Sequence, residues 1–175
     1  IGMNHQTVDV LSTCKAHLKS RDQELRETAA LALGIAQFEA AVGELLIPLA
    51  RDTAAGRSLA DRSEVDARTR SFATYALGLT AWATRGIETK RKCFAALQAI
   101  LADPATTDRN VRVAAINGIR LPRPAGPGAA EQELLGECLD TLWSCYQKQM
   151  GTGEQLIQAH VPPAIAQLLG RGGDV

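Results

Sequence analysis

The sequence predicts an all-α chain of about four helix pairs that stack in one elongated domain. Alanine and leucine dominate an apolar share of 46%, whereas aromatic residues make up only 4%, a balance that favours close-packed helices over sheets. A motif recurs at intervals of a little over forty residues, and apolar residues with helical spacing fill the stretches between its copies. The 175 residues suit one domain or one run of small repeats.

Charge and hydropathy narrow the class of protein further. Nineteen basic and nineteen acidic residues cancel, so the main argument for a nucleic-acid or membrane-surface role is missing. No run of about 18 apolar residues could span a bilayer, and the apolar content is too high for a disordered chain. No signal peptide is visible, which favours a cytoplasmic location. These observations predict a packed helical protein without a membrane span.

Four amphipathic helices form the first half of the predicted pairs. Each carries apolar residues at i, i+3 or i+4, and i+7, the spacing of one helix face. In the first helix this face consists of Val8, Leu11, Cys14 and Leu18. The predicted helices span approximately residues 5–19, 40–51, 88–102 and 130–149.

The recurring motif opens the second helix of each pair. Its copies begin at Asp22, Asp66, Asp108 and, in degenerate form, Glu154. Arg26, Arg70, Arg112 and Gln158 occupy the same position in the four copies, with steps of 44, 42 and 46 residues. This period is typical of two-helix repeats of about 40–47 residues. The predicted repeats span approximately residues 5–38, 40–83, 87–120 and 130–170.

The motif D-x-x-[VLT]-R-x-x-A-x-x-A-L-G, preceded by a helix such as 44–52, resembles the HEAT repeat. Its richness in alanine and glycine is similar to the bacterial HEAT-like repeats of the phycobilisome-lyase type. The resemblance covers nearly the whole chain. It implies an α-solenoid of the armadillo-like helical class, in which about four HEAT-like helix pairs form a right-handed superhelix. It carries little information about function.

The charged residues of the motif are predicted to be structural. The pairs share a spacing of i, i+4 with the acid first, an order that suits side-chain pairing and the helix dipole. The aspartates are also expected to cap their helices. HEAT proteins carry a polar ladder of such residues, and the resemblance assigns this ladder to Asp22, Arg26, Asp66, Arg70, Asp108 and Arg112.

Small residues recur on one face of the second helices and predict close helix–helix contacts. Ala29, Ala73 and Ala115 occupy equivalent positions, followed one turn later by Ala32, Ala76 and Gly118. Gly34 and Gly78 each cost about 1 kcal/mol of helix propensity. We expect close backbone packing to compensate for that cost.

Several segments depart from the simple repeat. Residues 53–65 predict a long polar loop, and residues 121–130 a stiff connector rich in proline and glycine. Pro162 and Pro163 predict a helix start or a kink. Neither the first nor the last helix pair reads as a polar cap, so we expect the chain to be a section of a longer solenoid, with further repeats or another domain covering an end.

No catalytic or metal-binding constellation is recognisable. The chain lacks phosphate-binding glycine loops, nucleophile elbows and zinc motifs, and its four cysteines form no C-x-x-C pair and are expected to be buried. The sequence therefore predicts no catalytic residue, no metal, no cofactor and no enzymatic activity.

One stripe on the second helix of the second repeat stands out. Arg68, Phe72, Tyr75, Leu79 and Trp82 follow one another at helical spacing. Core packing is the favoured interpretation, and an interface is the alternative, because tyrosine and tryptophan commonly anchor protein contacts.

The leading functional prediction is a protein-interaction or scaffold module that binds a partner on its concave face. The residues expected near the partner are Arg68, Tyr75, Trp82, Asn117 and Arg120. The alternative is a HEAT-like lyase, a DNA-glycosylase-type enzyme or a nucleic-acid binder, which would require basic residues gathered on one face. The candidates for that face are Arg68, Arg109, Arg112, Arg120 and Arg123.

Overall fold

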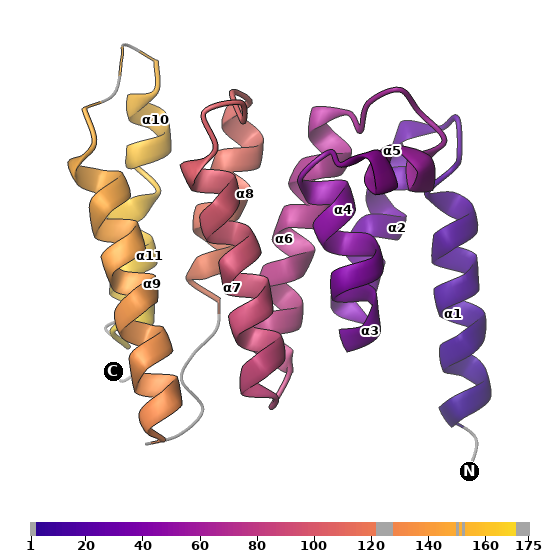
Figure 1. Cartoon of the computed structure of the whole chain (residues 1–175), viewed down its shortest axis with the longest axis horizontal. Coiled ribbons are helices and arrows are strands. Elements are labelled where there is room, and N and C mark those ends of the chain that lie inside the picture. The colour runs from indigo at the N-terminus through magenta and orange to yellow at the C-terminus, as the bar shows by residue number, and fades with distance from the viewer. Residues whose placement is uncertain (1–2, 122–127, 150, 152, 171–175) are drawn as a thin grey trace.

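The computed structural model describes residues 3–121, 128–149, 151 and 153–170, with side chains from residue 10 onward. Within these residues every regular element is a helix, which confirms the predicted all-α class (Figure 1). Arg123, most of the connector predicted at 121–130 and the residues at both chain ends lie outside the described part.

The first helix of each pair lies close to its predicted position. In the second pair it is divided into two α-helical stretches with a π-helical turn between them. These elements are α1 (Met3–His17), α3 (Glu39–Ala41), η1 (Val42–Leu46), α4 (Ile47–Ala50), α7 (Ile87–Ala102) and α9 (Ala129–Gln147). Pro48 is the second residue of α4, just after the π-helical turn, and its lack of a backbone N–H interrupts the regular ladder of helical hydrogen bonds there.

The second helices begin at the recurring motif. They are α2 (Gln23–Ile35), α6 (Ala67–Ala83), α8 (Arg109–Ile119), and the short helices α10 (Gln155–Gln158) and α11 (Val161–Leu168). Asp22, Asp66 and Asp108 cap α2, α6 and α8 by accepting backbone N–H hydrogen bonds, as predicted. Pro162 and Pro163 lie in the first turn of α11, so they mark a helix start.

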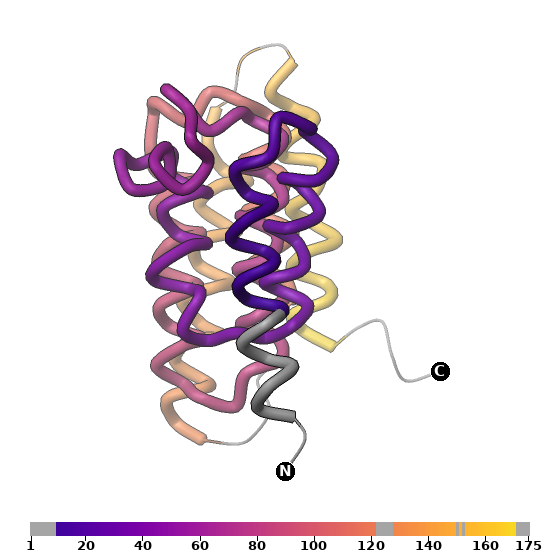
Figure 2. The backbone as a smooth tube through the Cα atoms, turned by 90° about the vertical axis from the view of Figure 1, so that its right-hand side faces the viewer, coloured from indigo at the N-terminus to yellow at the C-terminus, as the bar shows by residue number. Residues whose placement is uncertain are grey.

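Consecutive pairs lie side by side along the long axis of the molecule (Figure 1). Helix α6 packs extensively against both α2 and α8, whereas α11 contacts α8 only sparsely. Viewed along the long axis, the helices of successive pairs lie behind one another (Figure 2). The second helices α2, α6 and α8 therefore form one continuous layer, and the first helices lie on its other side.

Small residues set the distance between α2, α6 and α8. A Cβ atom added at Gly34 would lie 2.6 Å from the Cα of Ala76, and one added at Gly78 would lie 2.4 Å from the Cα of Gly118. These backbones touch, so the predicted close packing is confirmed. Arg120 occupies the position of Gly34 and Gly78 in the third repeat. At this position of α8, a long arginine side chain therefore stands where the two earlier repeats have a glycine in close backbone contact with the next second helix.

Residues 53–65 do not form the long loop that was predicted. Most of them fold into α5 (Ala54–Ala60), which Thr53 caps. Asp52 accepts hydrogen bonds from the Arg57 side chain and from the Val65 backbone N–H, at 2.8–3.0 Å and 2.7 Å. One carboxylate therefore joins the two ends of this segment, a contact between residues too far apart in sequence for a local pattern to reveal.

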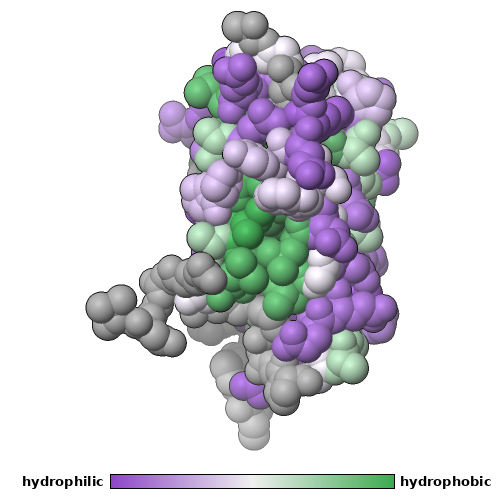
Figure 3. All heavy atoms as spheres, turned by 90° about the vertical axis from the view of Figure 1, so that its left-hand side faces the viewer, coloured by the Kyte–Doolittle hydropathy of each residue, from purple (hydrophilic) through white to green (hydrophobic). Residues whose placement is uncertain are grey.

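The end of the molecule formed by α9 and α11 has an apolar surface (Figure 3). Leu135 and Leu139 of α9 and Ile165 of α11 are half-buried, and Leu169 is 51% exposed. Trp143 and Tyr146 of α9 are also exposed, with their ring centroids 5.9 Å apart. We call these six residues the end face.

Candidate functional site

The layer of second helices carries a shallow groove between α6 and α8. Its volume is about 330 Å³, at the lower end of the range typical of ligand pockets. Mostly apolar side chains line it, with three polar groups among them. The lining residues are Leu31, Ser71, Phe72, Tyr75, Asn110, Val113, Ala114 and Asn117. We call this feature the second-helix groove.

The repeat positions these residues together. Leu31, Tyr75 and Asn117 each follow the motif arginine of their own helix by five residues, so the stacking of the helices places them in one row across the layer. Asn110 lies two turns before Asn117 on the same face of α8. The residue types in this row change from leucine to tyrosine to asparagine, while Val113 and Ala114 keep the α8 side of the groove largely apolar as well.

Asn117 contributes an unsatisfied polar atom to the groove. Its side-chain oxygen Oδ1 is buried and accepts no hydrogen bond from the described residues. A buried acceptor without a donor costs roughly 1–3 kcal/mol, so such atoms are uncommon in folded proteins. Because this oxygen is closed off from the surface, a ligand N–H beside Tyr75 could reach it only after the Asn117 amide turns toward the groove.

The structure brings together only part of the predicted partner-binding set. Tyr75 and Asn117 line the groove, whereas Arg68, Trp82 and Arg120 do not. Trp82 is 58% exposed, so core packing, the favoured interpretation of the stripe, is wrong for this residue. Phe72 and Tyr75 are half-buried. Because α6 already uses its small residues to contact both neighbouring helices, the aromatic stripe is left on the open side of the layer.

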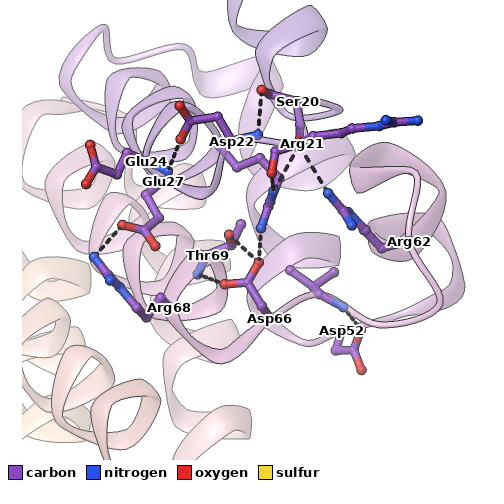
Figure 4. A network of polar contacts seen from close by, with 12 residues as sticks. Ser20, Arg21, Asp22, Glu24, Glu27, Asp52, Arg62, Asp66, Arg68 and Thr69 are labelled. Atoms are coloured by element: carbon purple, nitrogen blue, oxygen red, sulfur yellow. Dashed lines mark hydrogen bonds and ion pairs between the residues drawn. The ribbon is translucent and has the colours of Figure 1, made fainter.

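Arg68 and Glu27 form an ion pair at the α2 side of this surface (Figure 4). The guanidinium donates a 2.9 Å hydrogen bond to Oε2 of Glu27, whose side chain is only 4% exposed. The other carboxylate oxygen, Oε1, is buried without a hydrogen-bond partner among the described residues. The exposed Arg68 side chain therefore neutralises a buried carboxylate between α2 and α6.

The predicted charge ladder exists, but its contacts run between helix pairs. No described ion pair joins Asp22 to Arg26, Asp66 to Arg70 or Asp108 to Arg112, so pairing within one helix is wrong. Arg26 reaches Asp66 at 3.0 Å, and Arg112 reaches Glu154 at 3.1 Å. Each aspartate accepts N–H groups of its own first turn, and Asp66 also accepts the hydrogen bond from Arg26 of the preceding pair.

The middle rung of the ladder is different. Arg70 donates to the backbone carbonyl of Ala50 at 3.2 Å and to Oγ1 of Thr106 at 3.4 Å, not to a carboxylate. Asp66 is bonded to Thr69 and Arg26 (Figure 4). Burial acts to raise the pKa of Asp66, but these hydrogen bonds outweigh it and lower that pKa below its ordinary value.

The arginines that a nucleic-acid interface would need are not gathered on one surface. Arg68 bonds Glu27, and Arg112 is buried on another side of the layer, where it bonds Glu154. Arg109 is exposed, and Arg120 is half-buried with its Nε atom unpaired among the described residues. The four candidate arginines that the structure describes therefore do not line one common groove.

The cysteines are free, and three of the four are buried, as predicted. Burial raises the pKa of both Cys93 and Cys138 to about 12, so these thiols stay protonated at neutral pH. Among the described residues no cluster of three potential metal ligands occurs. In the same part of the chain, no helix combines the length and apolar character needed to cross a bilayer.

Sequence reasoning missed five groove residues, namely Leu31, Ser71, Asn110, Val113 and Ala114. The signal that could have identified Leu31 was its register, since it holds the position of Tyr75 and Asn117 one repeat earlier. Comparisons with family models, with curated proteins and with solved structures give no match.

Proposed function

We propose that this chain is a protein-interaction or scaffold module that binds a partner through the second-helix groove. The observation that carries this proposal is the buried Oδ1 of Asn117, which accepts no hydrogen bond within the described part of the chain and lies beside the half-buried ring of Tyr75. An apolar side chain of a partner would fill the space between Phe72 and Val113, and a neighbouring N–H group would donate to Asn117.

We also propose the finer architecture, a right-handed α-solenoid of HEAT-like helix pairs. Two observations support it. The direct backbone contacts at Gly34 and Gly78 recur from one pair to the next, and motif arginines bond carboxylates of the following pair at Arg26 and Arg112. The apolar end face supports the expectation that a further helix pair or another domain covers α9 and α11.

A peptide-display selection tests the proposed binding surface. The folded chain serves as bait for a random peptide library, and the Tyr75→Ala, Asn117→Ala double variant serves for counter-selection. We expect selected peptides to lose at least about tenfold in affinity on the double variant, or about 1.4 kcal/mol. Ala95→Ser, on an exposed position of α7, is the control and should leave affinity unchanged.

Mapping by amide chemical shifts then locates the bound peptide. Shifts confined to α6 and α8 around the groove would support the proposal. A triple variant that also carries Arg120→Glu extends the test. Peptides that bind the wild type, the double variant and the triple variant with equal affinity would show that the site lies elsewhere, with the 53–65 segment as the next candidate.

A further inference from the structure

A second cleft lies on the opposite side of α8, between α7 and α9. Its volume is about 490 Å³, well within the range of small-molecule sites. Gln98, Leu101 and Ala102 of α7 form one wall, Arg112 of α8 the floor, and a polar face of α9 the other wall. The cleft occurs where the last helix pair meets the rest of the molecule, and there α11 contacts α8 only sparsely.

Arg112 has fewer protein acceptors than the equivalent arginines of the other repeats. Arg26 donates to the carbonyls of Ser20 and Arg21 and to Asp66, and Arg70 donates to Ala50 and Thr106. Arg112 donates only to Glu154 among the described residues, although a guanidinium has five N–H donors. The residue is 9% exposed. A largely desolvated cation thus faces the cleft with most of its donors unused.

Other donors on α9 converge on the same region. Ser144 and Lys148 are one turn apart on the cleft side of this helix, and Thr141 bonds the side chain of Gln98 across the cleft at 3.1 Å. Burial raises the pKa of the Cys145 thiol, while the charges of both Arg112 and Lys148 act to lower it. Both cations therefore lie near this one sulfur atom.

The carboxylates of the cleft lie toward its other end. Glu137 is bonded by Arg91 at 2.9 Å, and Asp140 is exposed one turn before Ser144. Asp140 and Lys148 are eight residues apart, or about 12 Å along the helix axis. The cleft therefore has Lys148 and Arg112, the latter paired with Glu154, at one end and Asp140 at the other.

We propose that this cleft is a second binding site, for a small molecule with a carboxylate or phosphate group that binds Arg112 and Lys148. The hydroxyl of Ser144 donates a further hydrogen bond, and the uncharged part of the ligand lies against Leu101 and Cys145. Guanidinium groups match both oxyanions because two N–H donors can bind two oxygens at once. The site is independent of the second-helix groove, because it uses the other side of α8.

Titration with inorganic phosphate and, separately, with succinate tests this site. Amide chemical shifts are recorded at constant ionic strength, with chloride replaced as the anion is added. We expect saturable shifts around Arg112, Ser144 and Lys148, and the tighter of the two probes identifies the preferred oxyanion. Absence of saturable shifts with both probes would overturn the proposal.

Variants separate anion recognition from folding. Lys148→Gln and Ser144→Ala change exposed residues, and each should weaken binding, the former by about tenfold. Arg112→Gln should abolish it, whereas Arg109→Gln on the same helix should have no effect. Glu154→Gln should strengthen binding, because it weakens the acceptor that competes for Arg112. Unchanged anion affinity in both Lys148→Gln and Ser144→Ala would contradict the proposed site. This outcome does not depend on whether Arg112→Gln folds.

Discussion

Arg26 of α2 donates a 3.0 Å hydrogen bond to Asp66, the capping residue of α6, and makes no ion pair with Asp22 in its own helix. Arg112 makes the equivalent contact with Glu154, the residue before α10. Asp66 therefore has two functions, since it caps its own helix and receives the arginine of the preceding repeat. Through this contact the start of one second helix is fixed relative to the next.

The ladder contact should contribute substantially to stability. Arg26 is 6% exposed, and its removal leaves the carbonyls of Ser20 and Arg21 and the carboxylate of Asp66 without this donor. We expect Arg26→Ala to lower the free energy of unfolding by about 2–4 kcal/mol in urea titrations. Asp22→Asn retains a capping side chain and should cost less than about 0.5 kcal/mol. Equal losses of unfolding free energy in Arg26→Ala and Asp22→Asn would instead indicate that Arg26 pairs with Asp22 within one repeat.

The contact between α6 and α8 leaves no room for a side chain at Gly78. A Cβ atom there would lie 2.4 Å from the backbone of Gly118, so the helices would have to separate. We expect Gly78→Ala to destabilise the fold by about 2 kcal/mol or more, despite a gain in helix propensity of about 1 kcal/mol.

Gly136 on α9 provides the matched control for this substitution. A Cβ atom at Gly136 meets no atom within 4 Å, so Gly136→Ala should be stabilising by up to about 1 kcal/mol. Thermal unfolding of the two variants measures both effects. A stabilising Gly78→Ala would show that the backbones do not touch.

The last helix pair is held to α7 by ion pairs of unequal burial. Lys90 is 3% exposed and bonds Glu131 at 3.0 Å, whereas the Glu133 partner of Arg91 is 67% exposed. Glu131→Gln removes the charge that compensates a buried ammonium, and we expect a loss of about 2–4 kcal/mol. Glu133→Gln should change stability by less than about 1 kcal/mol.

Hydrogen exchange locates the effect of these two variants. Faster exchange in α9 for Glu131→Gln, with Glu133→Gln unchanged, would support a specific role for the buried pair in docking α9. The opposite order would assign that docking to the exposed pair.

Asp52 should make stability depend on acid pH. Hydrogen bonds from Arg57 and from the Val65 backbone lower the pKa of this carboxyl, although burial acts against them. A carboxyl group whose pKa is lowered in the folded state stabilises the fold at pH values above its unfolded-state pKa of about 3.9. This stabilising contribution is lost as the pH falls through the pKa that Asp52 has in the folded protein.

The Asp52→Asn variant isolates this contribution. Its side chain tolerates the positive φ of 51° at this position, and its stability should fall less steeply than wild type between about pH 5 and pH 2 in urea titrations. Asp61→Asn, also at positive φ but exposed, should keep the wild-type slope. If Asp52→Asn keeps that slope too, Asp52 is not the group responsible.

The sequence by itself determined the helices, their caps and the order of the repeats. These features depend on local physics: the spacing of apolar residues, an aspartate before each motif helix, and small residues at fixed intervals. The same register predicted that Gly34 and Gly78 lie at close contacts, because glycine within a helix needs a compensating approach. It also identified Tyr75 and Asn117, which the fold brings into one groove.

Only the tertiary structure decided which partner each charged side chain takes. Asp22 and Asp66 both cap their own helices, but the described ion pair of Arg26 is with Asp66 of the next helix pair. The folding of 53–65 around Asp52 and the cleft beside Arg112 likewise depend on contacts between distant residues. Such contacts depend on the distance between packed helices. The apolar periodicity of a single helix does not predict that distance.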